Sequence, residues 1–259
     1  GSDNIGVFTQ YIPLFGTVED KIIDCFKNGG GVPYSEYKRF HEVMSQDSEI
    51  SVVSSLNDLI LPSIPGLIEK LESGIEALDL GCGRGKAVIE MAEIFPKSNF
   101  VGYDLNNEAI EFARAQAAKK NLSNVKFDIK DLTNYNETAP ENTYDLITTF
   151  DAVHDQARPD NLLAGIYKAL KDDGIYLMQD IAGSSEQHKN SDHPIAPFLY
   201  SISTMHCMSV SLAQNGMGLG TMWGREKALE MIEEAGFKNV ELKNFEHDFQ
   251  NDYYVIKKT

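Results

Sequence analysis

Short apolar runs alternate along the chain with longer segments in which apolar residues recur every three or four positions. Five of these runs have the length and bounding turns of β-strands, and they cover residues 77–80, 100–105, 124–132, 144–151 and 175–181. Helical patterns follow three of them, from residue 86 onward, over 108–118 and over 162–170. Strands separated by helices predict an α/β fold with a parallel sheet.

The first predicted strand runs directly into a glycine-rich turn, Gly-Cys-Gly-Arg-Gly at residues 81–85. Glycine lacks the Cβ atom that would keep the backbone from turning tightly and touching a ligand. Asp79 lies at the end of this strand, where its carboxylate can accept a hydrogen bond or hold a cationic group. The next strand ends at Asp104, a place suited to an acid that binds ribose hydroxyls. This order of elements predicts a nucleoside-bearing cofactor, although an isolated turn can use the same glycines.

The spacing of the glycines excludes two common nucleotide sites. The third glycine comes one residue too early for a dinucleotide fingerprint, and no Gly-Lys-Ser/Thr follows, as a triphosphate-binding loop requires. Residues 78–85, Leu-Asp-Leu-Gly-Cys-Gly-Arg-Gly, closely resemble instead the first motif of the class I S-adenosylmethionine-dependent methyltransferases. The order of the later motifs is similar to that family over residues 75–259.

This resemblance implies a Rossmann-like fold: a doubly wound, seven-stranded, mostly parallel sheet in which residues 240–242 and 253–256 form the antiparallel sixth and seventh strands. It also implies S-adenosyl-L-methionine as cofactor, with S-adenosyl-L-homocysteine as its product. The residues expected to hold the cofactor lie at the ends of the first four strands or directly after them: Asp79, Gly81, Cys82, Gly83, Gly85, Asp104, Leu105, Asp131, Leu132, Phe150 and Asp151. Asp131 would lie near the adenine amino group. Cys82, in the glycine turn against the proposed cofactor, is expected to be a small packing residue and not a nucleophile.

Four further segments, residues 150–157, 193–198, 205–214 and 220–224, look like those of a group of bacterial and animal small-molecule methyltransferases. In that group a winged-helix-like module usually precedes the residues at which this chain begins. The first residues, Gly-Ser-Asp, look like a tag scar, so we expect either a trimmed chain or a natural catalytic-domain form. The substrates of the group are poorly defined, and the resemblance therefore names no acceptor.

Two helical regions flank the predicted cofactor domain of residues 75–259. Residues 1–74 are expected to form an N-terminal helical lid, with one helix over 35–44 capped by Ser35 and a second over 52–61 that ends before Pro62. An insertion over about 183–223 contains a helical stripe at 193–212 with Pro194 in its first turn. The second glycine cluster, at 216–220, follows no strand and is expected to be a loop.

The strongest compositional signal is the net charge of −16, from 39 acidic and 23 basic residues. Nucleic-acid affinity comes largely from lysines and arginines that neutralise phosphates, so DNA or RNA is a disfavoured partner. A small neutral or cationic substrate fits better, and a basic protein tail is also acceptable. No apolar run is long enough for a membrane span, and three scattered cysteines suit reduced thiols in the cytoplasm.

Three histidines are candidates for catalysis. His154 follows the fourth strand, at the edge where open α/β sheets present ligands, and the adjacent Asp155 could raise its basicity. It could equally cap a helix or bind the cofactor without moving a proton. His206, on the apolar stripe of the insertion, and His41, on the lid, could each contact substrate or be buried packing residues.

Several aromatic residues could wall a substrate pocket by stacking on a flat or cationic ligand: Tyr11, Tyr34, Tyr37, Phe198 and Trp223. Most such residues are simply core, and only Tyr34 and Trp223 lie beside glycine-rich loops. No metal is expected, because the histidines, aspartate and cysteine between 188 and 207 fit no compact zinc spacing.

The favoured function is methylation of a small molecule at O, N or S by in-line transfer. The alternatives are methylation of a protein side chain or amino terminus, and a cofactor-binding regulator that has lost catalysis. A homodimer is possible.

Overall fold

The computed structural model describes residues 5–258 and contains one seven-stranded sheet with the order β3-β2-β1-β4-β5-β7-β6. The strands are β1 (Glu76–Leu80), β2 (Asn99–Asp104), β3 (Val125–Ile129), β4 (Tyr144–Phe150), β5 (Leu170–Ile181), β6 (Asn239–Phe245) and β7 (Asp248–Lys257). The first five pair in parallel, and β7 pairs antiparallel with both β5 and β6. The predicted fold class and the two antiparallel strands are confirmed.

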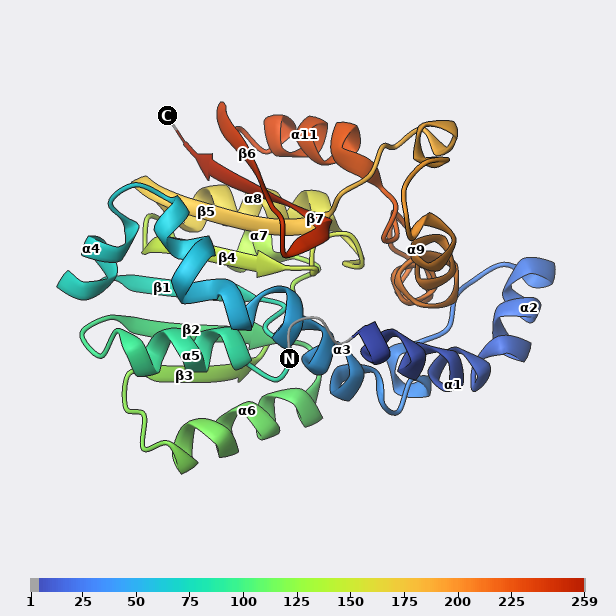
Figure 1. The fold of residues 1–259 in the computed structure, drawn as a ribbon, viewed down its shortest axis with the longest axis horizontal. Helices are drawn as coiled ribbons and strands as arrows, with labels where there is room; N and C mark the ends of the chain where they lie inside the picture. Colours follow the sequence, from blue (N-terminus) through green and yellow to red (C-terminus); the bar gives the residue numbers. More distant parts are fainter. Residues whose placement is uncertain (1–4, 259) are drawn as a thin grey trace.

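Helices cover both faces of the sheet (Figure 1). One face carries α5 (Lys86–Ile94) and α6 (Asn107–Lys119), whose apolar residues join a core with β1 and β4. The other face carries α7 (Tyr135–Thr138), α8 (Pro159–Ala169) and α11 (Gly224–Glu234), which form a second core. Burial on both faces explains why the central strands are continuous apolar runs in the sequence.

The first seventy residues divide between two cores. The elements η1 (Ile5–Gln10), α1 (Tyr11–Gly16), α2 (Glu19–Asn28), η2 (Tyr34–Glu36) and α3 (Phe40–Ser51) pack against the insertion. The following η3 (Val53–Ser55), η4 (Leu56–Ile60), η5 (Leu61–Ser63) and α4 (Leu67–Ser73) join the core under α5. The part of the chain that packs as a lid is therefore residues 5–51, and the expected boundary at residue 74 does not separate two cores.

Several helix boundaries differ from those predicted. Residues 34–36 form a single 3₁₀ turn and α3 begins at Phe40, so Ser35 caps no long helix. The reason is tertiary: the hydroxyl of Tyr37 donates to the carbonyl of Met205, 2.6 Å away, which holds the backbone between the two turns in a non-helical conformation. Pro62 lies inside the first turn of η5, where a backbone N–H would have no partner within the helix, so its missing N–H removes no hydrogen bond.

The insertion is also irregular. It contains η6 (Gln187–Asn190), α9 (Ala196–Ile202), η7 (Ser203–Cys207) and α10 (Met208–Ala213). Helix α9 begins at Ala196, so its first turn contains Pro197 and not Pro194. Residues 171–174 lie within β5, where its pairing with β4 is irregular.

The lid and the insertion lie together beyond the carboxyl ends of β1, β2 and β4, on the right of Figure 1. Open α/β sheets bind ligands at this edge, and both helical regions are therefore placed to enclose one. Among the described residues, no single helix is long and apolar enough to cross a membrane; one pair, Phe40–Ser63 with Leu67–Ser73, reaches those limits only together and is bent by 107°.

Candidate active site

The glycine turn after β1 adopts backbone conformations that require glycine. Gly81, Gly83 and Gly85 have φ angles of 74°, 52° and 69°. A Cβ atom on Gly81 would lie 2.6 Å from the Cβ of Ala152, whereas a Cβ on Gly83 would meet nothing within 4 Å. Gly83 therefore faces open space, and the turn can approach a ligand there.

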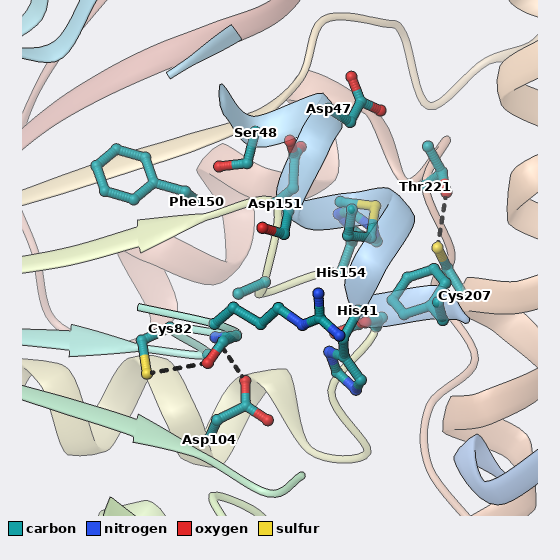
Figure 2. Close-up of a pocket in the computed structure, with 18 of the residues that line it drawn as sticks. His41, Asp47, Ser48, Cys82, Asp104, Phe150, Asp151, His154, Cys207 and Thr221 are labelled. Carbon is teal, nitrogen blue, oxygen red and sulfur yellow. Dashed lines mark hydrogen bonds between the residues drawn. The ribbon is translucent and has the colours of Figure 1, made fainter. Parts of the chain in front are cut away.

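Asp104 joins this turn to the end of β2. Its two carboxylate oxygens accept hydrogen bonds from the backbone N–H groups of Gly83 and Asn106, both at 2.8 Å. Figure 2 shows the bond to the glycine turn. Each oxygen keeps a second lone pair for a ligand hydroxyl. The predicted ribose-binding acid is thus also a residue that holds the turn in place.

A cavity of about 240 Å³ lies beside Asp104 and is also lined by Gly81 of the glycine turn. Asp104, Leu105, Asp131 and Leu132 all line it. The Oδ1 atom of Asp131 accepts a hydrogen bond from the N–H of Thr133 at 2.9 Å, which fixes the carboxylate at this end. The four residues predicted from the second and third strands therefore lie around one space.

A second cavity, of about 150 Å³, extends from the glycine turn toward the lid. Its lining contains Asp79, Gly81, Cys82, Gly83, Gly85, Phe150 and Asp151 of the predicted cofactor set. Burial raises the pKa of Asp79 to about 7, although a hydrogen bond from Thr148 acts in the opposite sense. A cationic group bound nearby would favour the ionised form of Asp79.

The lid and the insertion both supply aromatic residues to this cavity. Tyr11, Tyr34 and Phe198, three of the aromatic residues named from the sequence, line this cavity, and the ring of Phe198 meets that of Tyr11 edge to face, with ring centres 5.6 Å apart. The hydroxyl of Tyr11 donates to Asp47, 2.8 Å away. Burial raises the pKa of Asp47 to about 6, although the hydrogen bond from Tyr11 lowers it.

His154 lies in the same lining, directly after β4, and its partner comes from the end of β5. Its Nδ1 atom lies 2.8 Å from Oδ1 of Asp180. Both side chains are buried. Burial alone would lower the pKa of His154, but the negative charge of Asp180 outweighs it and holds that pKa well above its ordinary value.

The sequence suggested the adjacent Asp155 as the acid that could raise the basicity of His154, but the acid that contacts the imidazole and raises its pKa is Asp180. The carboxylate of Asp155 accepts a hydrogen bond from the hydroxyl of Tyr34 on the lid. Burial raises the pKa of Asp155 to about 6, while the nearby charge of His154 lowers it. Asp155 therefore links the sheet to the lid, and Asp180 orients the histidine.

The other two histidines are placed differently from each other. His41 lines both cavities and stacks on Tyr34, with ring centres 5.9 Å apart. His206 is fully buried, and its ring stacks on that of Phe40, with ring centres 3.5 Å apart. Burial holds the pKa of His206 well below its ordinary value. His206 is thus a neutral packing residue, which corrects its proposed catalytic contact.

Two predicted substrate residues lie outside both cavities. Tyr37 is buried against His206, with ring centres 4.7 Å apart. The indole Nε1 of Trp223 donates to Oδ1 of Asp180 at 3.0 Å. Trp223 therefore supports the acid behind His154 and does not wall the pocket.

Among the described residues, Asp151, His154 and Asp180 lie close enough together for a cation, with possible ligand atoms within 4.8 Å of one another. Oδ1 of Asp180 already accepts the N–H of Ile181 and the Nε1–H of Trp223 besides meeting His154. These hydrogen bonds hold the Asp180 carboxylate in the position from which it orients the imidazole of His154. Burial and the charge of Asp180 raise the pKa of Asp151, so protonation reduces the repulsion between the two acids.

The sequence reasoning missed Asp180 and Cys207. Asp180 ends the fifth predicted strand, and the same carboxyl-end rule that identified Asp104 could have found it. Cys207 lines the cavity and accepts a hydrogen bond from Thr221, as Figure 2 shows. Nothing local in the sequence marks it, because it reaches the cavity through the packing of the insertion.

Comparison with known proteins gives the family. A family model described as a methyltransferase domain matches residues 71–236. The chain is 35% identical over 115 residues to phosphoethanolamine N-methyltransferase of Triticum aestivum, covering 44% of this chain and 22% of that protein. It is 30% identical over 112 residues to (S)-coclaurine N-methyltransferase of Papaver somniferum, covering 43% and 31%. The chain thus spans less than a third of the length of these two relatives.

Among solved structures, the mitomycin 7-O-methyltransferase MmcR superposes with a TM-score of 0.68 at 15% identity, over 95% of this chain and 68% of that one. At this identity the likeness concerns the fold. The family match covers well over half of the sequence, and it agrees with the motif order and the sheet. The chain therefore belongs to the methyltransferase-domain family, with the sheet of the class I, S-adenosylmethionine-dependent members.

Proposed function

We propose that this protein transfers a methyl group from S-adenosylmethionine to a nucleophilic O, N or S atom of a small molecule. The main support is that one cavity is lined by both the glycine turn and His154, and that the buried Asp180 holds the imidazole of His154. The cofactor space and a candidate base therefore share one enclosure. The lid and the insertion cover it, which favours a small acceptor over a protein surface.

The described residues fit this cofactor. The positive-φ glycine turn leaves open space at Gly83, Asp104 has free lone pairs for the ribose, and Asp131 lies in the adjoining space suited to the adenine. The sulfonium of the cofactor makes its methyl group electrophilic. The protein must align the acceptor with that methyl group and exclude water, and such positioning can lower the barrier by about 7–11 kcal/mol.

His154 would serve as general base for an acceptor whose proton must leave. Asp180 fixes the imidazole orientation through Nδ1, so the Nε2 atom is available on the other side of the ring. A positioned base contributes about 10²–10⁴ in rate. Because the pKa of His154 is raised, its neutral, proton-accepting form becomes abundant only at a higher pH than for an ordinary histidine.

The cavity favours a neutral or cationic acceptor. Its lid side combines aromatic rings with the carboxyl groups of Asp47 and Asp155. The cationic Arg84 and Lys86 also line it, but each is paired, with Glu108 and Glu49 respectively. The relatives that act on phosphoethanolamine and coclaurine are N-methyltransferases by name, and an amine acceptor is consistent with these surroundings.

A labelled-methyl assay separates the candidate functions. The protein is incubated with methyl-labelled S-adenosylmethionine and a metabolite extract, a protein extract, or neither. Label in small molecules supports the proposal, label in macromolecules supports the protein-methylating alternative, and tight cofactor binding without transfer supports a silent regulator.

The same assay tests the role of His154. We expect His154→Ala to reduce transfer by about 10²-fold or more to a hydroxyl acceptor, with little change in cofactor affinity. His188→Ala is the matched control, because the His188 side chain is 76% exposed and does not line the cavity. Equal rates for the two variants would remove His154 from the chemistry.

A further inference from the structure

The acids that line the cavity of about 150 Å³ differ in how far their oxygens are already bonded. Both oxygens of Asp104 and both oxygens of Asp155 accept hydrogen bonds from the protein. One oxygen of Asp151 accepts a hydrogen bond, and the other is buried with no exposed surface. On Asp47 and Asp79, one oxygen is bonded and no described residue donates to the other. These two acids therefore each have an oxygen for a ligand.

Their positions give the two acids different ligands. Asp79 belongs to β1 beside the glycine turn, where the cofactor is expected. Asp47 lies on α3 of the lid and is 8% exposed. Its Oδ2 atom accepts the hydroxyl hydrogen of Tyr11 at 2.8 Å, which leaves Oδ1 as the free oxygen. In Figure 2, Asp47 lies at the top of the site, and Asp104 of the cofactor end lies at the bottom.

The carboxyl group of Asp47 is buried without a positively charged partner. Among the described residues, none forms an ion pair with it, and the cations of the same lining, Arg84 and Lys86, are paired with Glu108 and Glu49. An ionised carboxylate is costly to bury unless a cation or several hydrogen bonds compensate it. Burial accordingly raises the pKa of Asp47 to about 6. A cationic ligand would supply the missing partner.

Aromatic rings beside Asp47 indicate which kind of cation fits. Tyr11 and Phe198 line the same cavity, and their rings meet edge to face with centres 5.6 Å apart. Aromatic rings attract organic cations such as ammonium groups, whereas a divalent metal ion needs several oxygen ligands. One free carboxylate oxygen between aromatic side chains therefore suits an organic ammonium group.

We propose that Asp47 binds an ammonium group of the methyl acceptor, and that this acceptor is a small organic cation methylated at a different atom. The inference rests on the proposed function. An ammonium nitrogen cannot accept a methyl group, because its lone pair already holds a proton. The nucleophilic atom must be a second group, such as a hydroxyl, that reaches the part of the lining formed by His154. Small hydroxylated amines meet both requirements.

The test measures the binding of tyramine and tyrosol to the protein saturated with S-adenosylhomocysteine. The two compounds have the same phenol and two-carbon chain, but tyramine ends in an ammonium group and tyrosol in a hydroxyl. Hydrogen bonds between charged groups are about twice as strong as neutral ones. Ligand-observed NMR should therefore show at least tenfold tighter binding of tyramine. Asp47→Asn should weaken tyramine binding about tenfold and change tyrosol binding less than twofold.

Glu42→Gln is the matched control for this variant. It removes one negative charge from the same helix, but Glu42 pairs with Arg39 and lies outside both cavities. The control should keep the preference for tyramine. Tyramine that binds no more tightly than tyrosol, or a preference that survives Asp47→Asn, would overturn the proposal.

The cofactor also carries an ammonium group, on its methionine part, so calorimetry of S-adenosylhomocysteine accompanies the test. Asp47→Asn should change this affinity less than twofold, and a tenfold loss would assign Asp47 to the cofactor and overturn the proposal. No binding of S-adenosylhomocysteine to the unaltered protein would refute the proposed function itself. Normal cofactor binding without a preference for tyramine would refute only the role of Asp47.

A crystal structure of the unaltered protein with S-adenosylhomocysteine and tyramine decides the case if Asp47→Asn does not fold. An ammonium nitrogen within hydrogen-bond distance of Asp47 would support the proposal. An ammonium group bound elsewhere, or a cavity without tyramine, would overturn it.

Discussion

At the scale of single residues, the site depends on acids at the carboxyl ends of parallel strands. Asp104 ends β2, Asp151 follows β4 and Asp180 lies near the end of β5. Each has a different task because its partners differ: backbone N–H groups for Asp104, Gln179 for Asp151, and an imidazole for Asp180. The position of an acid along a strand could be predicted from the sequence, but its partner could not.

Asp180→Asn tests whether the acid controls the base. Removing its negative charge should lower the pKa of His154, because that charge is the main cause that raises it. The base acts in its neutral form, so kcat/KM should begin to rise at a lower pH than in the unaltered protein. Its maximum should fall by roughly tenfold to a hundredfold. An unchanged pH profile would show that Asp180 does not act through His154.

Asp104→Ala tests the ribose contact. It removes the acceptor for the cofactor hydroxyls and also frees the N–H of Gly83. Calorimetry should show at least a tenfold loss of S-adenosylhomocysteine affinity, consistent with loss of a hydrogen bond to a charged group. Asp128→Ala is a useful control, because Asp128 is exposed on β3 outside both cavities. Equal affinities for the two variants would refute the assignment.

At the scale of elements, the strands were predictable because their apolar runs are buried on both faces of the sheet. The lid was less predictable. Helix α3 starts at Phe40 and not near Ser35 because Tyr34 and Tyr37 form hydrogen bonds with Asp155 and Met205, which are distant in the sequence. Local patterns contain no information about such partners. For the same reason, Trp223 and Tyr37 were wrongly expected in the pocket wall.

The glycine turn gives a prediction about close packing. Gly81→Ala places a Cβ 2.6 Å from Ala152 at a φ of 74°, whereas Gly83→Ala is strained only by its φ of 52°. The left-handed backbone destabilises both variants by about 1–2 kcal/mol. Overpacking against Ala152 destabilises Gly81→Ala by about 1–3 kcal/mol more. Chemical denaturation should show the larger loss of unfolding free energy for Gly81→Ala. The opposite order would contradict the packing of this turn.

The contact between lid and sheet can be tested with Tyr34→Phe. The hydroxyl of Tyr34 lowers the pKa of Asp155, which is about 6, so its removal should raise that pKa further. Carboxyl NMR should detect this upward shift. A looser lid should also increase KM several-fold more than it changes kcat. Tyr144→Phe is a control remote from the lid, and an equal effect from it would argue against a Tyr34–Asp155 link.

At the scale of the whole molecule, a sheet covered on both faces carries two helical regions beyond the carboxyl ends of its strands. Residues 5–51 and the insertion share one apolar core, formed by residues such as Tyr11, Val43, Phe198 and Val210. The enclosed site follows from this shared core, which sequence patterns alone did not locate. A cytoplasmic location and a homodimer stay predictions.

The central claim is that the two adjacent cavities, which share Asp104 and Gly81 in their linings, hold S-adenosylmethionine with its sulfur directed toward His154. A crystal structure with S-adenosylhomocysteine tests it most directly. We predict the ribose on Asp104, the adenine near Asp131, and the sulfur facing the part of the cavity lined by His154 and Cys207. A nucleoside bound elsewhere, or a sulfur turned away from His154, would contradict the account.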